Sequence, residues 1–373
     1  MAPPASAAFP GANGKIAFRT SRDGNLEIYA MNPDGSGQVN LTNNPAQEEH
    51  AAWSPDGARI AFRTNRDGNN EVYVMNADGS GQVNLTNTPA HDAEPTWSPD
   101  GTKIAFRTNR DGDTEVYVMN ADGSGQVNLT NNAGSADGGP TWSPDGTRIA
   151  FTTDRDVNDE IYVMDTDGSN PVNLTNSLAD EGDPTWSPDG TRIAFTTTRD
   201  GDREVYVMNA DGSGQVNLTN NADFDGAPAW SPEGTRIAFP TGREGNDEVY
   251  VMNADGSAPT NLTNNPDLDG EPDWAVRLPN KTVLLKAKPR RMERGEKTRL
   301  RARVLPCEGH EGDVVEFYRK KKRIATRNSN ANCVAELRVK VTKTTKFRAV
   351  SPEQDFDHLA GRSKPVKVKV RRR

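Results

Sequence analysis

The chain has 373 residues, of which 33% are apolar, and a formal net charge of −8 at pH 7. No apolar run in this sequence is long enough to cross a bilayer as a helix. The net charge hides a division, because residues 277–373 carry 29 Lys and Arg against 10 Asp and Glu, or +19, whereas residues 1–276 carry −27. Such asymmetry predicts different partners for the two parts, or docking of one part on the other.

Residues 1–13 form an Ala- and Pro-rich start without the charged and apolar regions of a complete signal peptide. Its Ala-Ser-Ala-Ala stretch, residues 5–8, is typical of a signal-peptide cleavage region. Two interpretations stay open: the tail of an export signal whose front is missing, or a disordered start. The first predicts an extracellular or periplasmic location.

Residues 14–276 repeat one unit. In its clearest copy the unit begins Pro-Thr-Trp-Ser-Pro-Asp-Gly-Thr-Arg-Ile-Ala-Phe at Pro140 and ends Val-Asn-Leu-Thr at Thr175. A fixed period in this range is typical of repeat architectures. All six tryptophans of the protein occupy the same place in successive units, 44 or 45 residues apart: Trp53, Trp97, Trp142, Trp186, Trp230 and Trp274.

Each unit contains four short runs separated by Asp-Gly turns, which favours β-strands joined by hairpins. Ile-Ala-Phe and Val-Tyr-Val-Met are continuously apolar, as expected for strands buried on both faces. Four-stranded units of this length are typical of propeller blades. The first unit lacks a Trp strand and the last Trp strand lacks a continuation, so residues 271–276 are predicted to pair with residues 15–20 and complete a sixth blade.

The string Trp-Ser-Pro-Asp-Gly-x-x-Ile-Ala-Phe, followed by Arg-Asp-Gly and Glu-Val-Tyr-Val-Met-Asn-x-Asp-Gly, resembles the WD40-like repeats of TolB-type six-bladed propellers. The resemblance covers residues 14–276. The domain of helices and sheet that this family carries before its propeller has no counterpart in the sequence. Related propellers also occur in prolyl peptidases, whose hydrolase domain is likewise absent from it. The resemblance is therefore specific for the fold and not for a function.

Residues 277–373 alternate apolar and basic residues in short runs, which favours a small β-sandwich with one buried and one solvated face. This segment looks like a bacterial immunoglobulin-like module. Its two cysteines, Cys307 and Cys333, suggest a disulfide bond in an exported chain, and reduced buried thiols are the alternative. The basic charge predicts contact with an anionic envelope polymer or with the acidic propeller, and a solvated basic face without a partner is the alternative. Nucleic acid is not expected, because few aromatic residues accompany the basic ones.

The sequence contains no nucleophile elbow and no zinc-binding helix motif, and its four histidines do not cluster. We therefore predict a non-enzymatic protein that binds a protein, a ligand or an envelope polymer, acts as a monomer and needs no cofactor. The alternative is a propeller enzyme, similar to six-bladed lactonases and lyases, with a site at the channel mouth.

Two acidic sets precede the tryptophans. If the Trp strands line the central channel, the more varied set, three residues before Trp, meets at one mouth and forms a candidate cation or basic-ligand site. It comprises Glu94, Asp183 and Glu271 in alternate units, with His50, Gly139 and Ala227 between them. An acid also stands five residues before every Trp, which indicates a structural ring whose side chains cap a turn. The ring contains Glu48, Asp92, Asp137, Glu181, Asp225 and Asp269.

The hairpins between the second and third runs contain Arg-Asp-Gly or a close variant. The ordinary interpretation is turn chemistry. An alternative is an oxygen-rich calcium loop at Asn109, Asp111, Asp113 and Glu115. Because successive strands reverse direction, these hairpins share one face of the propeller with the varied inter-blade loops. Varied loops on a rigid scaffold predict that recognition occurs on that face.

Overall fold

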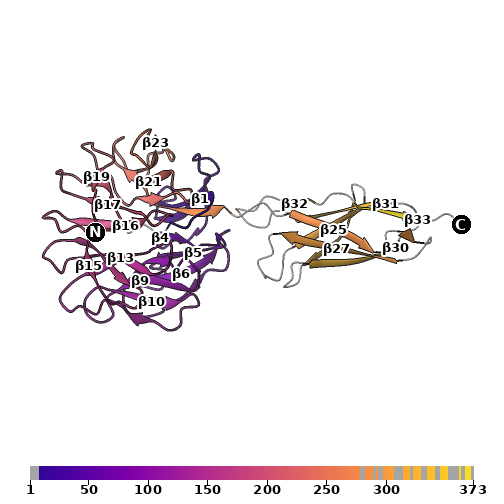
Figure 1. The fold of residues 1–373 in the computed structure, drawn as a ribbon, viewed down its shortest axis with the longest axis horizontal. Helices are drawn as coiled ribbons and strands as arrows, with labels where there is room; N and C mark the ends of the chain where they lie inside the picture. Colours follow the sequence, from indigo (N-terminus) through magenta and orange to yellow (C-terminus); the bar gives the residue numbers. More distant parts are fainter. Residues whose placement is uncertain are drawn as a thin grey trace. The chain divides into compact units, whose positions relative to one another are not determined.

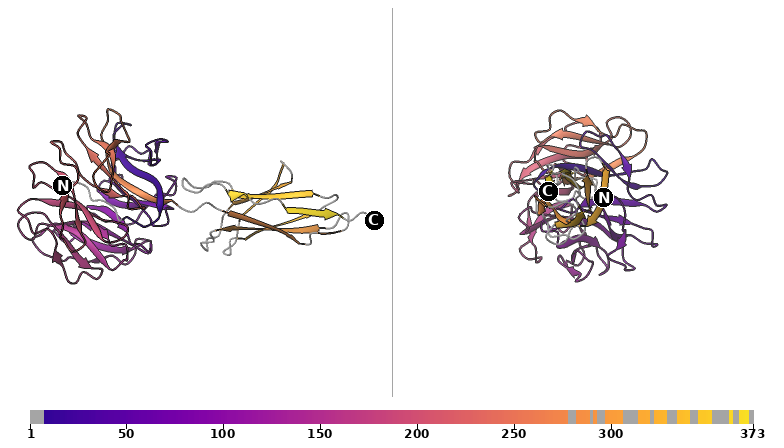
Figure 2. Two further views of the ribbon diagram at one scale, coloured as in Figure 1. Left: turned by 45° about the horizontal axis from the view of Figure 1, so that its top comes forward. Right: turned by 90° about the vertical axis from the view of Figure 1, so that its right-hand side faces the viewer.

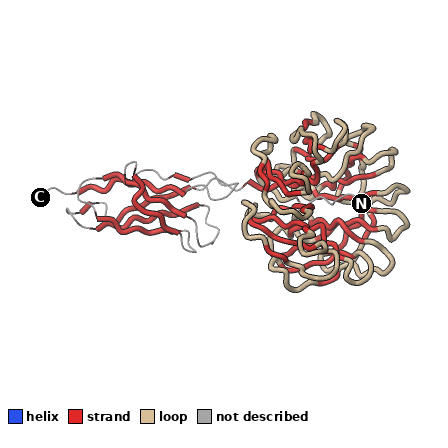
Figure 3. Tube along the Cα trace, turned by 180° about the vertical axis from the view of Figure 1, so that it is seen from behind, coloured by secondary structure: helices blue, strands red, loops and turns tan. Residues whose placement is uncertain are grey.

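The described residues form strands and no helix (Figure 3), so none of them belongs to a helix that is long and apolar enough to cross a membrane. The chain divides into two compact units, Met1–Arg277 and Leu278–Arg373. The structure is a computed structural model that describes residues 8–277, 282–288, 291–292, 297–305, 314–319, 322–328, 334–340, 345–351, 361–362 and 366–370.

The first unit is a six-bladed β-propeller (Figures 1 and 2), which confirms the predicted all-β propeller fold. Each blade is an antiparallel sheet of four strands. Blade 1 contains β4 (Glu48–Trp53), β5 (Arg59–Thr64), β6 (Glu71–Asn76) and β7 (Val83–Asn84). Blade 2 contains β8 (Asp92–Trp97), β9 (Lys103–Thr108), β10 (Glu115–Asn120) and β11 (Val127–Asn128). Blade 3 contains β12 (Asp137–Trp142), β13 (Arg148–Thr153), β14 (Glu160–Asp165) and β15 (Val172–Asn173).

The remaining blades follow the same plan. Blade 4 contains β16 (Glu181–Trp186), β17 (Arg192–Thr197), β18 (Glu204–Asn209) and β19 (Val216–Asn217). Blade 5 contains β20 (Ala229–Trp230), β21 (Arg236–Thr241), β22 (Glu248–Asn253) and β23 (Thr260–Asn261). Blade 6 contains β24 (Asp269–Arg277), β1 (Ala12–Thr20), β2 (Glu27–Met31) and β3 (Val39–Asn40).

Blade 6 is assembled from both ends of the propeller sequence. β24 pairs antiparallel with β1, and Trp274 lies opposite Ile16. The Trp-bearing strands of successive blades contact one another around the ring, including β24 with β4. These six strands are therefore innermost and line the central channel. Pairing of the two ends leaves no open inner edge at the junction.

The core lies between the blades, where the aromatic residues of the repeat are buried. All six tryptophan side chains are at most 3% exposed. Within each blade a Phe of the second strand packs against a Tyr of the third, as for Phe106 and Tyr117, whose ring centroids are 5.9 Å apart. The second and third strands are continuously apolar because neighbouring blades cover both of their faces.

The alternation of strand direction sorts the loops into two faces. We call the face with the Arg-Asp hairpins and the inter-blade loops the hairpin face. We call the opposite face, which carries the Ser-Pro-Asp-Gly turns between first and second strands, the Ser-Pro face. The central channel has one end at each face, and the candidate residues three positions before Trp lie toward the hairpin face.

The described strands of the second unit form two sheets. One sheet contains β25 (Thr282–Lys288), β27 (Lys297–Leu305) and β30 (Val334–Lys340). The other contains β26 (Arg291–Met292), β33 (Val366–Val370), β31 (Thr345–Ser351), β28 (Val314–Arg319), β29 (Lys322–Asn328) and β32 (Gly361–Arg362). The immunoglobulin-like assignment stays a prediction. Cys307 and Cys333 lie outside the described residues, and so does their proposed disulfide.

Candidate functional site

The hairpin-face mouth of the channel is built on a backbone distortion that recurs in the inner strands. The residue three positions before each Trp has a positive φ, between 36° and 59°. A left-handed conformation costs a residue other than glycine about 1–2 kcal/mol, and only one of the six is glycine. Such strain persists where surrounding contacts compensate for it. The six residues are His50, Glu94, Gly139, Asp183, Ala227 and Glu271.

Three carboxylates at these positions supply the compensating contacts. Each accepts a hydrogen bond from the backbone N–H of the left-handed residue in the next blade. This pattern explains why acids occur only in alternate blades, since the intervening residue contributes its backbone and not its side chain. The bonds run from His50 to Glu271 at 2.7 Å, from Gly139 to Glu94 at 2.8 Å, and from Ala227 to Asp183.

Arginine side chains bind the same three carboxylates at the mouth. Each is partly exposed, whereas the carboxylate it binds is almost fully buried. The three carboxylates therefore already have cationic partners from the chain itself. The nitrogen–oxygen distances are 2.8 Å for Arg19–Glu271, 3.0 Å for Arg107–Glu94 and 4.0 Å for Arg203–Asp183.

His50, the fourth member of the candidate cation site, is buried beside Glu271, with its Nε2 3.6 Å from the carboxylate Oε1. Burial lowers the pKa of His50, although the charges of Glu271 and Glu94 oppose this. Among the described residues no group of three His, Cys, Asp or Glu side chains is arranged to hold a metal ion. The structure brings the four candidate residues to one mouth, but as parts of inter-blade contacts.

The six acids five residues before Trp are at most 2% exposed, and each pairs with the hairpin arginine of its own blade. The same guanidinium lies over two rings, as for Arg110, 5.5 Å from the Phe106 centroid and 4.7 Å from that of Tyr117. Burial raises the pKa of Glu48 to about 7. The carboxylates thus tie the inner strand to the hairpin. In four blades they also accept a side-chain hydrogen bond from the loop before the strand, from Thr88, Ser177, Asn221 and Asn265. The pairs are Arg66–Glu48 at 3.2 Å, Arg110–Asp92 at 3.0 Å, Arg155–Asp137 at 3.2 Å, Arg199–Glu181 at 2.9 Å, Arg243–Asp225 at 3.1 Å and Arg22–Asp269 at 3.1 Å.

The carboxylates of the calcium-loop hypothesis, Asp111, Asp113 and Glu115, each accept hydrogen bonds from protein donors. They are not among any group of three His, Cys, Asp or Glu side chains that could hold a metal ion in the described part of the chain, whereas a calcium site requires six or more convergent oxygen ligands. The donors are Tyr117 and Asn128 for Asp111, the backbone of Gly134 for Asp113, and Thr130 and the backbone of Asn132 for Glu115.

The mouth has a filled half and an open half. On blades 6, 1 and 2 the residue after Ile-Ala-Phe is an arginine that binds mouth carboxylates, including Glu49. On blades 3, 4 and 5 the same position holds a shorter side chain. Sequence reasoning missed the arginines, although their restriction to three consecutive units was the available signal. The arginines are Arg19, Arg63 and Arg107, and the shorter residues are Thr152, Thr196 and Pro240.

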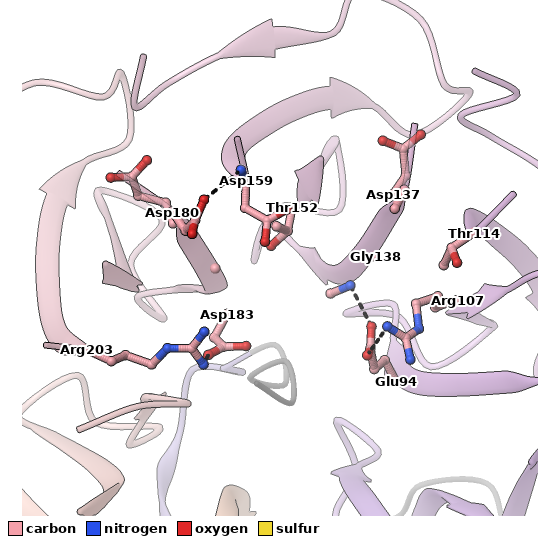
Figure 4. Close-up of a pocket in the computed structure, with 14 residues that line it drawn as sticks. Glu94, Arg107, Thr114, Asp137, Gly138, Thr152, Asp159, Asp180, Asp183 and Arg203 are labelled. Atoms are coloured by element: carbon pink, nitrogen blue, oxygen red, sulfur yellow. Dashed lines mark hydrogen bonds and ion pairs between the residues drawn. The ribbon is translucent and has the colours of Figure 1, made fainter. Parts of the chain in front are cut away.

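A pocket of about 50 Å³ lies in the open half, between residues of blades 2, 3 and 4. A Cβ on Gly138 would lie 2.9 Å from the Arg107 side chain, so a larger residue at this wall would have to displace the arginine. Figure 4 shows Arg107 and Arg203 on opposite sides of the pocket and Asp159 beside Asp180 at its edge. The volume is sufficient for a few water molecules or for the end of one side chain.

Replacing Asp183 by asparagine should flatten the pH dependence of stability between about pH 4 and pH 7. Burial raises the pKa of Asp183 to about 7, against the opposing effects of Arg203 and Thr196. Below about pH 4 the folded and unfolded chains both keep this proton. As the pH rises, the unfolded chain releases the proton that the folded chain retains, so stability is lost. Thermal melting at several pH values measures the slope, and equal slopes for both proteins would contradict the prediction.

The architecture defines a six-bladed propeller in which each blade carries one buried tryptophan, and the two halves of its hairpin-face mouth hold different side chains. The sequence matches the profile of the TolB beta propeller domain, PD40, over residues 3–84, 50–137 and 124–224. These matches cover more than half of the chain, which therefore belongs to this family. A comparison with curated protein sequences finds no match.

Solved structures support the same fold. TolB from Acinetobacter baumannii is 25% identical over 70% of this chain and 66% of its own, with a TM-score of 0.62. The putative TolB from Agrobacterium tumefaciens is 24% identical over 72% of this chain and 93% of its own, with a TM-score of 0.57. Hydrazine synthase of Kuenenia stuttgartiensis is 12% identical over 92% of this chain and 66% of its own, with a TM-score of 0.60. The chain thus matches just under two thirds of the Acinetobacter protein, and the propeller fold is shared with an enzyme.

Proposed function

We propose that the protein is a non-enzymatic binding protein of the cell envelope that holds a segment of a protein partner at the hairpin-face mouth. The pocket in the open half of that mouth is the observation that carries the proposal. It lies among varied loops on a rigid ring, where binding residues concentrate. Arginines of the chain itself occupy the filled half of the mouth. The partner segment would therefore bind to one side of the channel, over blades 3 and 4.

The charges at the pocket edge favour a basic side chain in the partner. Burial raises the pKa of Asp159, and the neighbouring carboxylates of Asp180 and Asp154 add to this effect. Among the described residues neither Asp159 nor Asp180 forms an ion pair. A lysine or arginine placed between them would relieve the repulsion between the two carboxylates.

Export and an envelope location are parts of the same proposal. The cleavage-like stretch near residue 7 and membership of the TolB propeller family support them. The second unit, with its net charge of +18, would contact an anionic polymer of the envelope. Like the mouth, it would serve attachment and not catalysis.

The alternative remains a propeller enzyme at the same mouth, since related folds occur in enzymes. Such an enzyme needs a base or nucleophile within reach of a substrate. His50 is 8% exposed and lies against Glu271, and the mouth carboxylates accept backbone hydrogen bonds. These contacts favour the binding role.

The test compares labelled peptides that differ only in charge. A peptide with a central Lys or Arg should bind the full-length protein at about pH 7, and its Glu counterpart should not. Asp180→Asn should weaken binding of the basic peptide about 3- to 10-fold, which corresponds to the loss of one partly exposed ion pair. Fluorescence anisotropy at low ionic strength measures this.

The matched control is Asp223→Asn, which removes the same charge from an exposed position in the equivalent loop of blade 5. It should leave binding unchanged. Equal binding of both peptides, or an equal loss in the two variants, would refute recognition at the pocket.

A further inference from the structure

Residues 8–11, the described part of the chain before β1, lie inside the propeller at the Ser-Pro end of the channel. Ala8 and Phe9 are each only 4% exposed. Phe9 belongs to the buried cluster that contains Trp97 and Trp142 of blades 2 and 3. Ala8, its neighbour in sequence, belongs to the cluster that contains Trp230 of blade 5. Two consecutive residues therefore reach opposite walls of the ring, which places them within the channel.

The segment is held by the Ser-Pro-type turn of blade 5. The backbone N–H of Gly11 donates to the carbonyl of Pro232 at 3.1 Å. The Glu233 N–H donates to the Asn13 side-chain oxygen at 3.1 Å, and the Asn13 amide reaches the Glu233 carboxylate at 3.5 Å. Gly11 itself is packed so closely that a Cβ would lie 2.4 Å from Val276.

The sequence carries a matching signal in this turn. In blades 1 to 4 the third residue of the Ser-Pro-Asp-Gly turn is aspartate. Its carboxylate accepts hydrogen bonds within its own turn, as Asp100 does from Ser98 and Thr102. Blade 5 has the longer Glu233, whose carboxylate reaches Asn13 instead. The turn sequence therefore differs from that of blades 1 to 4 in the one blade whose turn contacts the N-terminal segment.

We infer that the Ser-Pro end of the channel is an apolar receptor for a short segment with an aromatic side chain, and that residues 8–11 occupy it in cis. A buried aromatic ring supplies the largest apolar area of any side chain. Attachment to β1 keeps the segment at an effective concentration on the order of millimolar. A competing segment from another protein must exceed that concentration or bind more tightly. This site lies at the opposite end of the channel from the proposed peptide pocket and does not depend on it.

The first test replaces Phe9 by alanine in the full-length protein. Loss of a buried Phe should lower the melting temperature of the propeller by roughly 5–10 °C. The tryptophan emission should also shift to longer wavelength, because water reaches the cluster around Trp97 and Trp142. Leu268→Ala, at a half-exposed position on the hairpin face, is the control and should leave both readings nearly unchanged. An unchanged melting temperature for the Phe9 variant would overturn the inference.

The second test asks whether the channel can bind a free peptide, or whether it only packs against the segment that is covalently attached to β1. A chain without residues 1–10 should melt at a lower temperature than the full-length protein. The acetylated, amidated hexapeptide of residues 5–10, Ala-Ser-Ala-Ala-Phe-Pro, should restore part of the loss at millimolar concentration, because it replaces the tethered segment. The same peptide with Ala in place of Phe should not. Absence of restoration, or equal restoration by both peptides, would show packing without a receptor and overturn the inference.

Discussion

Replacing Trp186 by alanine should lower the free energy of unfolding of the propeller by about 3–5 kcal/mol, the usual cost of truncating a large buried aromatic side chain. The Trp186 side chain is fully buried, and the guanidinium of Arg148 lies 5.1 Å from its ring. Alanine would remove this stacking and leave a cavity between blades 3 and 4. Because each blade contributes one such buried tryptophan, the tryptophans act as wedges between blades and not as ligand platforms.

Urea unfolding followed by circular dichroism measures the loss. Trp186→Phe should cost less than half as much, because the phenyl ring fills most of the space. Leu178→Ala, at a fully exposed loop position, should change stability by less than about 0.5 kcal/mol. A Trp186→Ala protein as stable as the Leu178 variant would mean that the tryptophans do not hold the blades together.

The blades could be predicted from the sequence because their signals are local and repeated. The Trp-Ser-Pro-Asp-Gly string specifies a strand end and its turn, and Ile-Ala-Phe specifies a strand buried on both faces. Six copies in register turn a weak local preference into a specific fold. The missing Trp strand of the first unit, opposite Ile16, also carried the signal for ring closure, since β24 supplies that strand.

The mouth was only partly predictable, because its contacts join different blades. The alternation of Glu94, Gly139 and Asp183 marked the right positions. It did not show that a carboxylate of one blade binds the backbone of the next, since the left-handed conformation at these residues is invisible in the sequence. Nor did it reveal Arg203, which comes from a hairpin 20 residues after Asp183.

The N-terminal segment shows a second limit of sequence reasoning. Residues 1–13 have the composition of a signal remnant or a disordered start, and nothing periodic links Phe9 to the tryptophans. Its burial depends on a channel that exists only after six blades have assembled. The one local signal was Glu233 in place of aspartate. Its role can be recognised only from the structure, in which Asn13 lies beside it.

Replacing Arg110 by methionine should destabilise the propeller by about 3–5 kcal/mol, because it leaves Asp92 as a buried charge without its cation. The Asp92 carboxylate is fully buried, and among the described residues its second oxygen accepts a hydrogen bond only from Thr88, at 3.0 Å. Methionine keeps the apolar stem but removes the ion pair and the contact of the guanidinium with the Phe106 and Tyr117 rings.

The double-mutant cycle with Asp92→Asn distinguishes the charge from the packing. Asparagine carries no charge, so the double variant should be more stable than Arg110→Met alone, with a coupling energy of about 1–3 kcal/mol. Arg236→Met, at an exposed position of β21, is the control and should have little effect. If Asp92→Asn gives no rescue, the hairpin arginine stabilises the blade through ring stacking alone. Rescue would establish the six buried pairs as the electrostatic link between the inner strands and the hairpins that form the mouth.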